Sequence, residues 1–220
     1  MAYVLNIDTA IDRASICLSK NGEPVNLSSN DNPRDQAAWL QPAISDQLAA
    51  AGIGFDALKA VAVSVGPGSY TGLRIGLSTA KGLCYALNIP LIAIGTLEMM
   101  AAAATDRVAD LLCPMIDARR MEVFTAIYNK KMETVLAPCA MVLDENSFTD
   151  ILNKHTVLFY GNGSTKYKSL SKHENAFFDT ITINALQLIK ISNRRLVAND
   201  FNSLAYTEPM YIKNFHHSVK

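Results

Sequence analysis

Two aspartates in the sequence could organise Mg²⁺ and the phosphates of a nucleotide. Asp8 ends the apolar run 3–8, and Asp117 ends a similar run at 112–117. Carboxylate oxygens are among the ligands that Mg²⁺ prefers in proteins. An acid that follows a strand also serves as a turn or cap residue. Each aspartate therefore has a structural interpretation beside the chemical one.

A glycine-rich segment, 66–72, separates a predicted strand from a predicted helix and reads Gly-Pro-Gly-Ser-Tyr-Thr-Gly. It is neither a P-loop, because no Gly-Lys-Ser or Gly-Lys-Thr follows, nor a dinucleotide fingerprint, because Thr71 replaces the third glycine. Amides at a helix N-terminus can still hold an anion or a partner's carboxylate. The alternative is a tight turn with Ser69 or Thr71 as the helix cap. The predicted nucleotide or anion contacts are Asp8, Gly66, Gly68, Ser69, Thr71 and Asp117.

Small residues repeat at every fourth position of the helix after this turn, at Gly72, Gly76 and Ala80. They make a narrow groove that a second helix could approach closely. Leucines lie on the other faces, so the helix is apolar nearly all round, which is unusual for a surface helix. The alternative is that the groove packs on the protein's own sheet. We expect a partner interface made of Gly72, Leu73, Gly76, Leu77, Ala80, Leu40 and Ile44.

The motifs of common catalytic sites are missing from the sequence. Its four histidines form neither HxxxH nor HExxH, and its four cysteines form no CxxC pair. No GxSxG elbow is present. The pairs Arg119-Arg120 and Arg194-Arg195 could touch phosphate, although isolated pairs are usually solvated surface. We therefore expect no catalytic residue and no metal site.

Hydrophobic periodicity predicts strands that alternate with helices. Three antiparallel strands are expected in the first 27 residues, with Asn21-Gly22 as a hairpin turn. Helical spacing follows from 36 to 51, and a buried strand spans 60–65. After the glycine-rich turn we expect a helix to about residue 88, a strand at 91–94 and an alanine-rich helix from about 97.

This pattern begins again near residue 112, which indicates an internal duplication. Ile7-Asp8 pairs with Ile116-Asp117 at an offset of 109 residues, and each pair precedes an alternating strand and a turn. The second half continues with a helix at 147–154, a strand at 157–160 and a helix around 185–196. An acid-ended strand with a hairpin, occurring twice, resembles the actin-like ATPase architecture. We predict an α/β fold of two duplicated actin-like (ribonuclease H-like) lobes, each a mixed sheet flanked by helices.

The predicted domains are 1–105, the lobe with the partner interface, and 106–220, whose tail packs back on the body. Lys plus Arg is 20 and Asp plus Glu is 20, so no net field draws the chain to a polyanion. The first eight residues do not form a signal peptide, and no apolar run is long enough to span a membrane. Reduced cysteines and a cytoplasmic location fit best.

Four segments resemble the bacterial TsaB (YeaZ) family. The longest is 64–76, Ser-Val-Gly-Pro-Gly-Ser-Tyr-Thr-Gly-Leu-Arg-Ile-Gly, and the others are 7–10, 116–124 and 208–213. The resemblance covers nearly the whole chain and is weakest over 140–205. Two positions depart from the family pattern.

Gln36 stands where many members carry histidine, and Phe124 replaces the usual tyrosine. The resemblance implies an actin-like fold and a non-catalytic subunit that pairs with TsaD, the related transferase. That enzyme puts threonylcarbamoyl groups on adenosine next to the anticodon of tRNA. The resemblance also implies TsaE as a third member of the complex, a homodimer when the chain is alone, and contact with tRNA only through the complex.

The resemblance implies no cofactor of the chain's own, and leaves ATP or ADP to the partner interface. Two other functions remain open at this stage. One is a small-molecule phosphotransferase of the actin-like superfamily, with Asp8 or Asp117 organising Mg²⁺. The other is a glycopeptidase, for which the sequence supplies no metal ligands.

Overall fold

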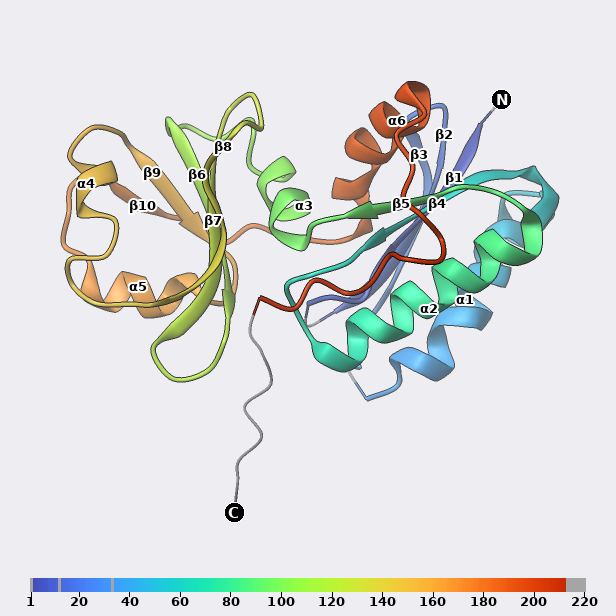
Figure 1. The fold of residues 1–220 in the computed structure, drawn as a ribbon, viewed down its shortest axis with the longest axis horizontal. Coiled ribbons are helices and arrows are strands. Elements are labelled where there is room, and N and C mark those ends of the chain that lie inside the picture. Colours follow the sequence, from blue (N-terminus) through green and yellow to red (C-terminus); the bar gives the residue numbers. More distant parts are fainter. Residues whose placement is uncertain (1, 12, 33, 213–220) are drawn as a thin grey trace, which may run out of the picture. The chain divides into compact units, whose positions relative to one another are not determined.

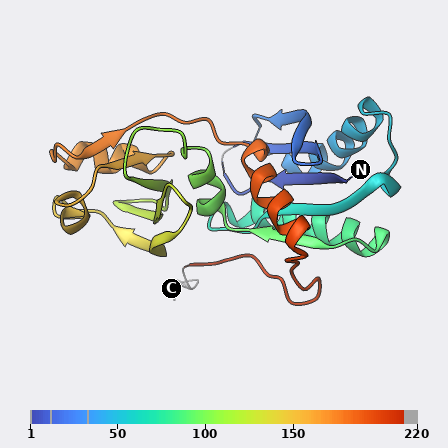
Figure 2. The same cartoon turned by 90° about the horizontal axis from the view of Figure 1, so that it is seen from above.

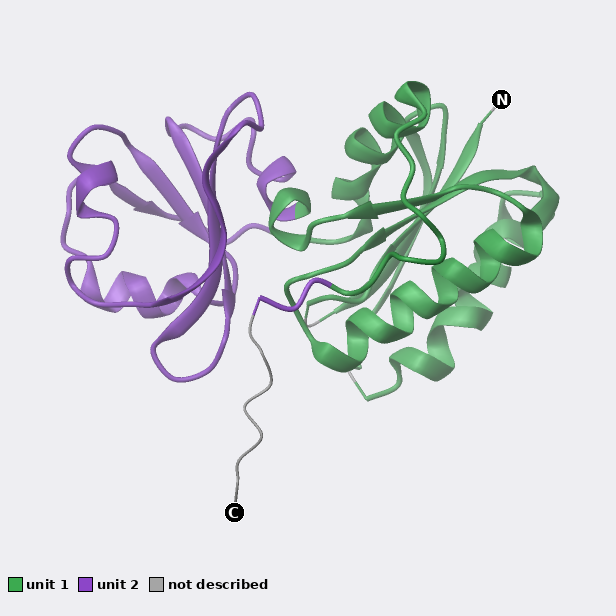
Figure 3. Cartoon of the chain, in the orientation of Figure 1, with its two compact units in different colours: residues 1–99, 182–209 green, residues 100–181, 210–220 purple. Residues whose placement is uncertain are grey.

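The computed structural model describes residues 2–11, 13–32 and 34–212, and the chain divides into two compact units (Figure 1). The first comprises residues 1–99 and 182–209, and the second comprises residues 100–181 and 210–220 (Figure 3). Over the described residues, no helix has both the length and the apolar character needed to cross a membrane.

The first unit is a five-stranded sheet in the order β3-β2-β1-β4-β5. Its elements are β1 (Tyr3–Asp8), β2 (Ala14–Lys20), β3 (Glu23–Asn30), α1 (Gln36–Ala50), the 3₁₀ turn Phe55–Ala57, β4 (Leu58–Ser64), α2 (Tyr70–Leu87) and β5 (Leu91–Ile94). β1 runs antiparallel to β2 and parallel to β4, and β5 runs parallel to β4. The predicted turn joins β2 to β3, with Asn21 and Gly22 both at positive φ.

The second unit repeats this topology, as the duplication predicted. Its sheet order is β10-β9-β6-β7-β8, so β6 takes the place of β1 and β9 that of β4. The elements are β6 (Leu111–Asp117), β7 (Glu122–Asn129), β8 (Thr134–Val142), α4 (Thr149–Leu152), β9 (Val157–Tyr160), α5 (Ser164–Leu170) and β10 (Ala176–Phe178). Asp8 and Asp117 thus end equivalent central strands.

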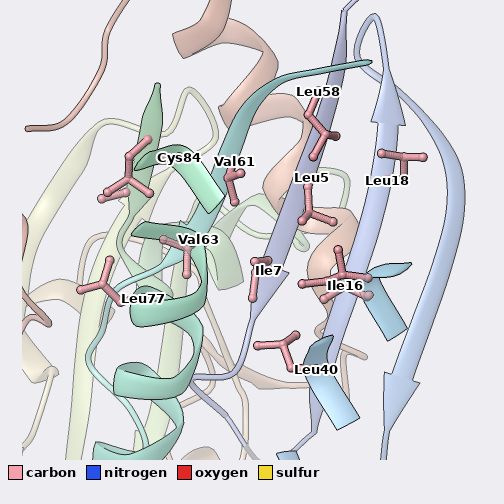
Figure 4. Packing of buried hydrophobic residues seen from close by; sticks show 14 of the residues in the cluster. Leu5, Ile7, Ile16, Leu18, Leu40, Leu58, Val61, Val63, Leu77 and Cys84 are labelled. Atoms are coloured by element: carbon pink, nitrogen blue, oxygen red, sulfur yellow. The ribbon is translucent and has the colours of Figure 1, made fainter. Parts of the chain in front are cut away.

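Each unit has its own apolar core. In the first, residues from the central strands meet leucines of α1 and α2, as Figure 4 shows for Leu40 and Leu77 beside Ile7 and Val63. The second core includes a cluster of aromatic rings, in which the ring centroid of Phe159 lies 5.3 Å from that of Phe148 and 4.8 Å from that of Tyr167. The segment between the units contains α3 (Thr96–Ala102).

The C-terminal helix corrects the predicted domain boundary. Residues 106–220 were expected to form one lobe, but 182–209 belong to the first unit. Helix α6 (Leu188–Ala198), after the 3₁₀ turn Ala185–Gln187, packs on β1, β4 and β5, on the face of the sheet opposite α1 and α2 (Figure 2). Ser192 Oγ donates to the buried Asn6 Oδ1 at 2.7 Å, and Asn6 Nδ2 donates to Ser19 Oγ at 3.0 Å. These buried polar bonds fix α6 on the first sheet.

The chain after α6 stays on the first unit up to residue 207. Asn202 forms a bridge to Leu91 at the edge of β5, and its Oδ1 accepts from the amide of Ala93 at 2.7 Å. Lys81 of α2 donates to the carbonyl of Thr207 at 3.2 Å. This segment therefore covers the free edge of β5, which would otherwise present unpaired backbone groups.

Candidate functional site

The turn between β1 and β2 lies against the first turns of α2 with almost no space between them. Thr9 Oγ1 donates to the carbonyl of Gly72 at 2.7 Å, and the amide of Ser69 donates to the carbonyl of Ala10 at 2.7 Å. A Cβ added at Gly72 or Gly76 would meet Thr9 at under 3.0 Å. Glycine is therefore the residue that allows α2 to approach this turn.

The small-residue face of α2 is consequently used by the protein itself. The residues predicted as the partner interface are all buried within the first unit: Gly72, Leu73, Gly76, Leu77, Ala80, Leu40 and Ile44. They contact the β1–β2 turn, the sheet and each other rather than solvent. The predicted interface is thus corrected, because packing on the chain's own sheet accounts for the small residues.

The opposite face of α2 is the part that remains accessible. Tyr85 is 81% exposed, and Tyr70 is 40% exposed with its ring 3.9 Å from the guanidinium carbon of Arg74. A side chain at Gly82 would meet nothing within 4 Å. Sequence reasoning missed this face because it concentrated on the small residues. Arg74 follows Tyr70 by four residues and Gly82 follows Arg74 by eight, which places them on one side of the helix and could have revealed this face.

The glycine-rich turn donates several of its amides to acceptors in the chain. The Gly66 amide donates to Thr96 Oγ1 at 3.1 Å, and the Gly72 amide donates to Ser69 Oγ at 3.2 Å. The Ser69 amide is bound to Ala10, as described above. The segment is therefore a tight turn in which Ser69 is the N-cap of α2. Of the four residues predicted to hold an anion here, Gly66 and Ser69 have their amides occupied, and the contacts at Gly68 and Thr71 stay a prediction.

Asp8 is fully buried at the end of β1. Its Oδ1 accepts from Ser64 Oγ at 2.6 Å and from the amide of Ala10 at 3.1 Å. Its Oδ2 has no hydrogen-bond partner among the described residues. Burial raises the pKa of Asp8 to about 6, although the bonds from Ser64 and Ala10 act in the opposite direction. A carboxylate without solvent or a cation carries a free-energy cost in its charged form.

Asp117, the equivalent acid of the second unit, has the opposite environment. Its side chain is 40% exposed, and its Oδ1 lies 2.7 Å from Lys166 Nζ. The hydrogen bond from Lys166 lowers its pKa below the usual value, with a further contribution from the Arg119 amide at 2.6 Å. Each aspartate is therefore held by its own unit, Asp8 by a hydroxyl and an amide, and Asp117 by an ammonium group.

The positions flagged as departures from the family pattern are both partly or wholly enclosed. Gln36 is buried at the start of α1, and Phe124 is half-buried in β7. In the part of the chain that the structure describes, no group of three or more His, Cys, Asp or Glu side chains could hold a metal ion. Residues His216 and His217 lie outside the described residues.

Comparison with known proteins gives one consistent family. Residues 31–208 match the model of the TsaD family, described as tRNA N6-adenosine threonylcarbamoyltransferase. The chain is 26% identical to the tRNA threonylcarbamoyladenosine biosynthesis protein TsaB of Haemophilus influenzae, over 96% of this chain and 93% of that one. It is 30% identical to the protein of the same name from Bacillus subtilis, over 76% and 74% respectively.

Solved structures agree with the sequence relatives. YeaZ from Pseudomonas aeruginosa superposes with a TM-score of 0.81 at 26% identity, covering 96% of this chain and all of that one. An inorganic polyphosphate/ATP-glucomannokinase from Arthrobacter superposes with a TM-score of 0.52 at 9% identity, covering 90% of this chain and 100% of that one. The second likeness concerns the fold alone and agrees with the predicted actin-like class.

Exchanging Gly76 for alanine tests whether the small-residue face packs on the β1–β2 turn. The added Cβ would overlap Thr9, so we expect Gly76→Ala to lower the free energy of unfolding by about 1–3 kcal/mol. Gly82→Ala, in the same helix but facing open space, should raise it by up to about 1 kcal/mol through helix propensity. Urea unfolding measures both. Equal stability of the two variants would contradict the packing described here.

The buried Asp8 should make stability depend on pH. Its pKa is about 6 in the folded chain and 3.8 in the unfolded chain, so the folded state binds the proton more tightly. The stability from this group is fully present below about pH 4 and is lost as pH rises through 6. The loss amounts to about 3 kcal/mol, at about 1.4 kcal/mol for each pKa unit.

Asp8→Asn should remove this dependence, so that its stability relative to the parent rises between about pH 4 and pH 7. Asp117→Asn is the matched control. The pKa of Asp117 is lowered in the fold, so its contribution is present at neutral pH and lost as pH falls. Unfolding by urea across this range measures both variants. A parallel pH profile for Asp8→Asn and the parent would rule out the buried ionisation.

Proposed function

We propose that this chain, which belongs to the TsaB (YeaZ) family of tRNA threonylcarbamoyladenosine biosynthesis proteins, serves that pathway without a catalytic centre of its own. Its place in the pathway is that of a partner subunit in the formation of threonylcarbamoyladenosine, and TsaD is its partner. The transfer of the threonylcarbamoyl group to tRNA then falls to TsaD.

The observation that carries this proposal is the engagement of both equivalent aspartates in holding the fold. Asp8 is enclosed and bonded to Ser64 and Ala10, and Asp117 is bound to Lys166. In the actin-like architecture these acids would have to face a nucleotide and its metal ion. A carboxylate that is fully buried, or neutralised by a lysine, is poorly suited to bind Mg²⁺. The chain therefore has the fold of an ATPase, but its two equivalent aspartates stabilise the structure.

The proposed contact with TsaD is the outward face of α2, not the small-residue face. Exposed aromatic side chains are typical of protein interfaces, and this face carries Tyr85 and, beside Arg74, Tyr70. A second copy of the chain could use the same face, which would give the homodimer when TsaD is absent. TsaE completes the proposed set, as the family resemblance implies.

We further propose that the chain binds no nucleotide by itself. The amides of Gly66, Ser69 and Gly72 are already bonded within the first unit, which supports this. ATP or ADP would then be bound only at the interface with TsaD. The four cysteines are free thiols, which fits a cytoplasmic protein.

Reconstitution with purified proteins tests the proposed function. The chain alone should neither hydrolyse ATP nor modify tRNA, and modification should appear when TsaD and TsaE are added with threonylcarbamoyl-adenylate. Titration calorimetry of Mg-ATP into the chain alone should show no binding. Modification of tRNA by a preparation free of TsaD, or turnover of ATP with a small-molecule acceptor, would overturn the proposal in favour of an enzyme.

Gly82→Arg tests the outward face of α2. A long side chain fits the isolated chain at this position, but it should separate the helices of a partner that packs there. Overpacking of a close contact costs about 1–3 kcal/mol, so we expect about a tenfold to hundredfold weaker affinity for TsaD with an unchanged unfolding temperature. Val197→Arg, at a residue 76% exposed on α6, is the matched control and should pair normally. Equal affinity of both variants would place the interface elsewhere.

A further inference from the structure

The connection between β6 and β7 presents two arginines side by side on an unusual backbone. Arg119 and Arg120 are both exposed, and both have positive φ, 70° and 47°. The amide of Ala118 donates to the carbonyl of Glu122 at 3.1 Å, which closes a three-residue hairpin loop over 119–121. Positive φ favours glycine, because left-handed backbone costs an ordinary residue about 1–2 kcal/mol. The chain therefore carries two guanidinium groups where glycine would be more stable.

The base of this turn is held rigidly by polar contacts. Asp117 Oδ1 accepts from the Arg119 amide at 2.6 Å and from Lys166 Nζ at 2.7 Å. Lys166 Nζ also donates to the carbonyl of Glu122 at 3.0 Å. The amide of Asp117 donates to Asn162 Oδ1 at 2.9 Å. Both strands that lead into the turn are thus tied to α5 and to the turn before it, so the two arginines are projected from a fixed support.

The positive charges of Arg119 and Arg120 are not neutralised by ion pairs among the described residues. Asp117, the acid two residues before Arg119, is bound by Lys166. No side-chain hydrogen bond or ion pair of Arg119 or Arg120 is found over residues 2–11, 13–32 and 34–212. Elsewhere in the chain Arg195 is bonded to Glu98 at 3.0 Å. Counting Lys166 with the two arginines, and Glu122 with Asp117, three cations stand against two acids.

Guanidinium groups in this setting suit phosphate. Arginine keeps its charge at any physiological pH, and its planar fork matches the oxygens of a phosphate group. A chain with equal numbers of basic and acidic residues has no field that would attract RNA over a distance. Two contacts of this kind can nevertheless bind a polyanion that another protein already holds close by. Two exposed arginines on strained backbone indicate a functional role for this turn, and phosphate binding is the role that suits their chemistry.

We propose that Arg119 and Arg120 bind phosphates of the tRNA backbone while the tRNA is held by the complex with TsaD. This rests on the proposed function, and it gives the chain a direct contact with the tRNA, where the family resemblance implied only an indirect one. The contact is independent of base sequence, because phosphates carry no sequence information. Its role is to fix the position of the tRNA on the complex.

The test uses the reconstituted complex of this chain with TsaD and TsaE, and measures tRNA binding from about 50 to about 200 mM salt. Loss of two phosphate contacts should make the slope of log affinity against log salt shallower by about 1.5, at about 0.7–0.9 for each contact. The ratio of the tRNA affinity of the parent complex to that of the Arg119→Ala/Arg120→Ala complex should therefore fall about eightfold between the lowest and the highest salt concentration. Assembly of the complex, followed by size-exclusion chromatography, should be unchanged.

Two further variants separate charge from structure. Arg119→Gly/Arg120→Gly relieves the left-handed backbone, so it should unfold at the same or a higher temperature and still show the shallower salt slope. Lys131→Ala/Lys154→Ala removes two exposed charges elsewhere in the second unit and should keep the parent's slope. An unchanged slope in the intact arginine-variant complex overturns the proposal. If the arginine variants no longer assemble with TsaD, the proposal is also overturned, because the arginines would then contact TsaD and not tRNA. Failure of the parent chain to pair with TsaD would instead count against the proposed function.

Discussion

The arrangement of the first unit depends on one close contact, between the β1–β2 turn and the first two turns of α2. Thr9 binds the carbonyl of Gly72, and Ala10 accepts the amide of Ser69. This contact sets the distance of α2 from the sheet and brings the glycine-rich segment back onto the chain. It also covers the end of β1, which leaves Asp8 without solvent. A wider separation would open that strand end, as an enzyme using the carboxylate would need.

The two units show how one topology can diverge in electrostatics while its backbone is kept. The sheets have the same strand order, and their central strands both end in aspartate. In the first unit the carboxyl is enclosed with Ser64, and its pKa is raised. In the second it is exposed to solvent and paired with Lys166, and its pKa is lowered. Burial in one unit and a lysine ammonium in the other therefore shift the pKa of equivalent residues in opposite directions.

Local signals in the sequence were reliable where the physics is local. The turn at Asn21-Gly22 was predictable because positive φ selects those residues, and the duplication was visible because Ile7-Asp8 and Ile116-Asp117 end equivalent strands. The spacing of Gly72, Gly76 and Ala80 correctly indicated close approach, but it cannot say which element approaches. That depends on Thr9, more than sixty residues earlier in the chain. Likewise, nothing in the periodicity of α6 says which sheet it covers, because the bond from Ser192 to Asn6 is a tertiary contact.

The return of α6 to the first sheet has a consequence for biosynthesis. Translation produces β1, β4 and β5 early, yet the helix that covers one face of them comes from residues 188–198, after every strand of the second sheet. The second unit is made in between and has all of its sheet strands before α6 appears. The nascent chain must therefore carry an uncovered apolar sheet face on the ribosome while the later unit is already able to fold. In this protein the domain that begins first is the one completed last.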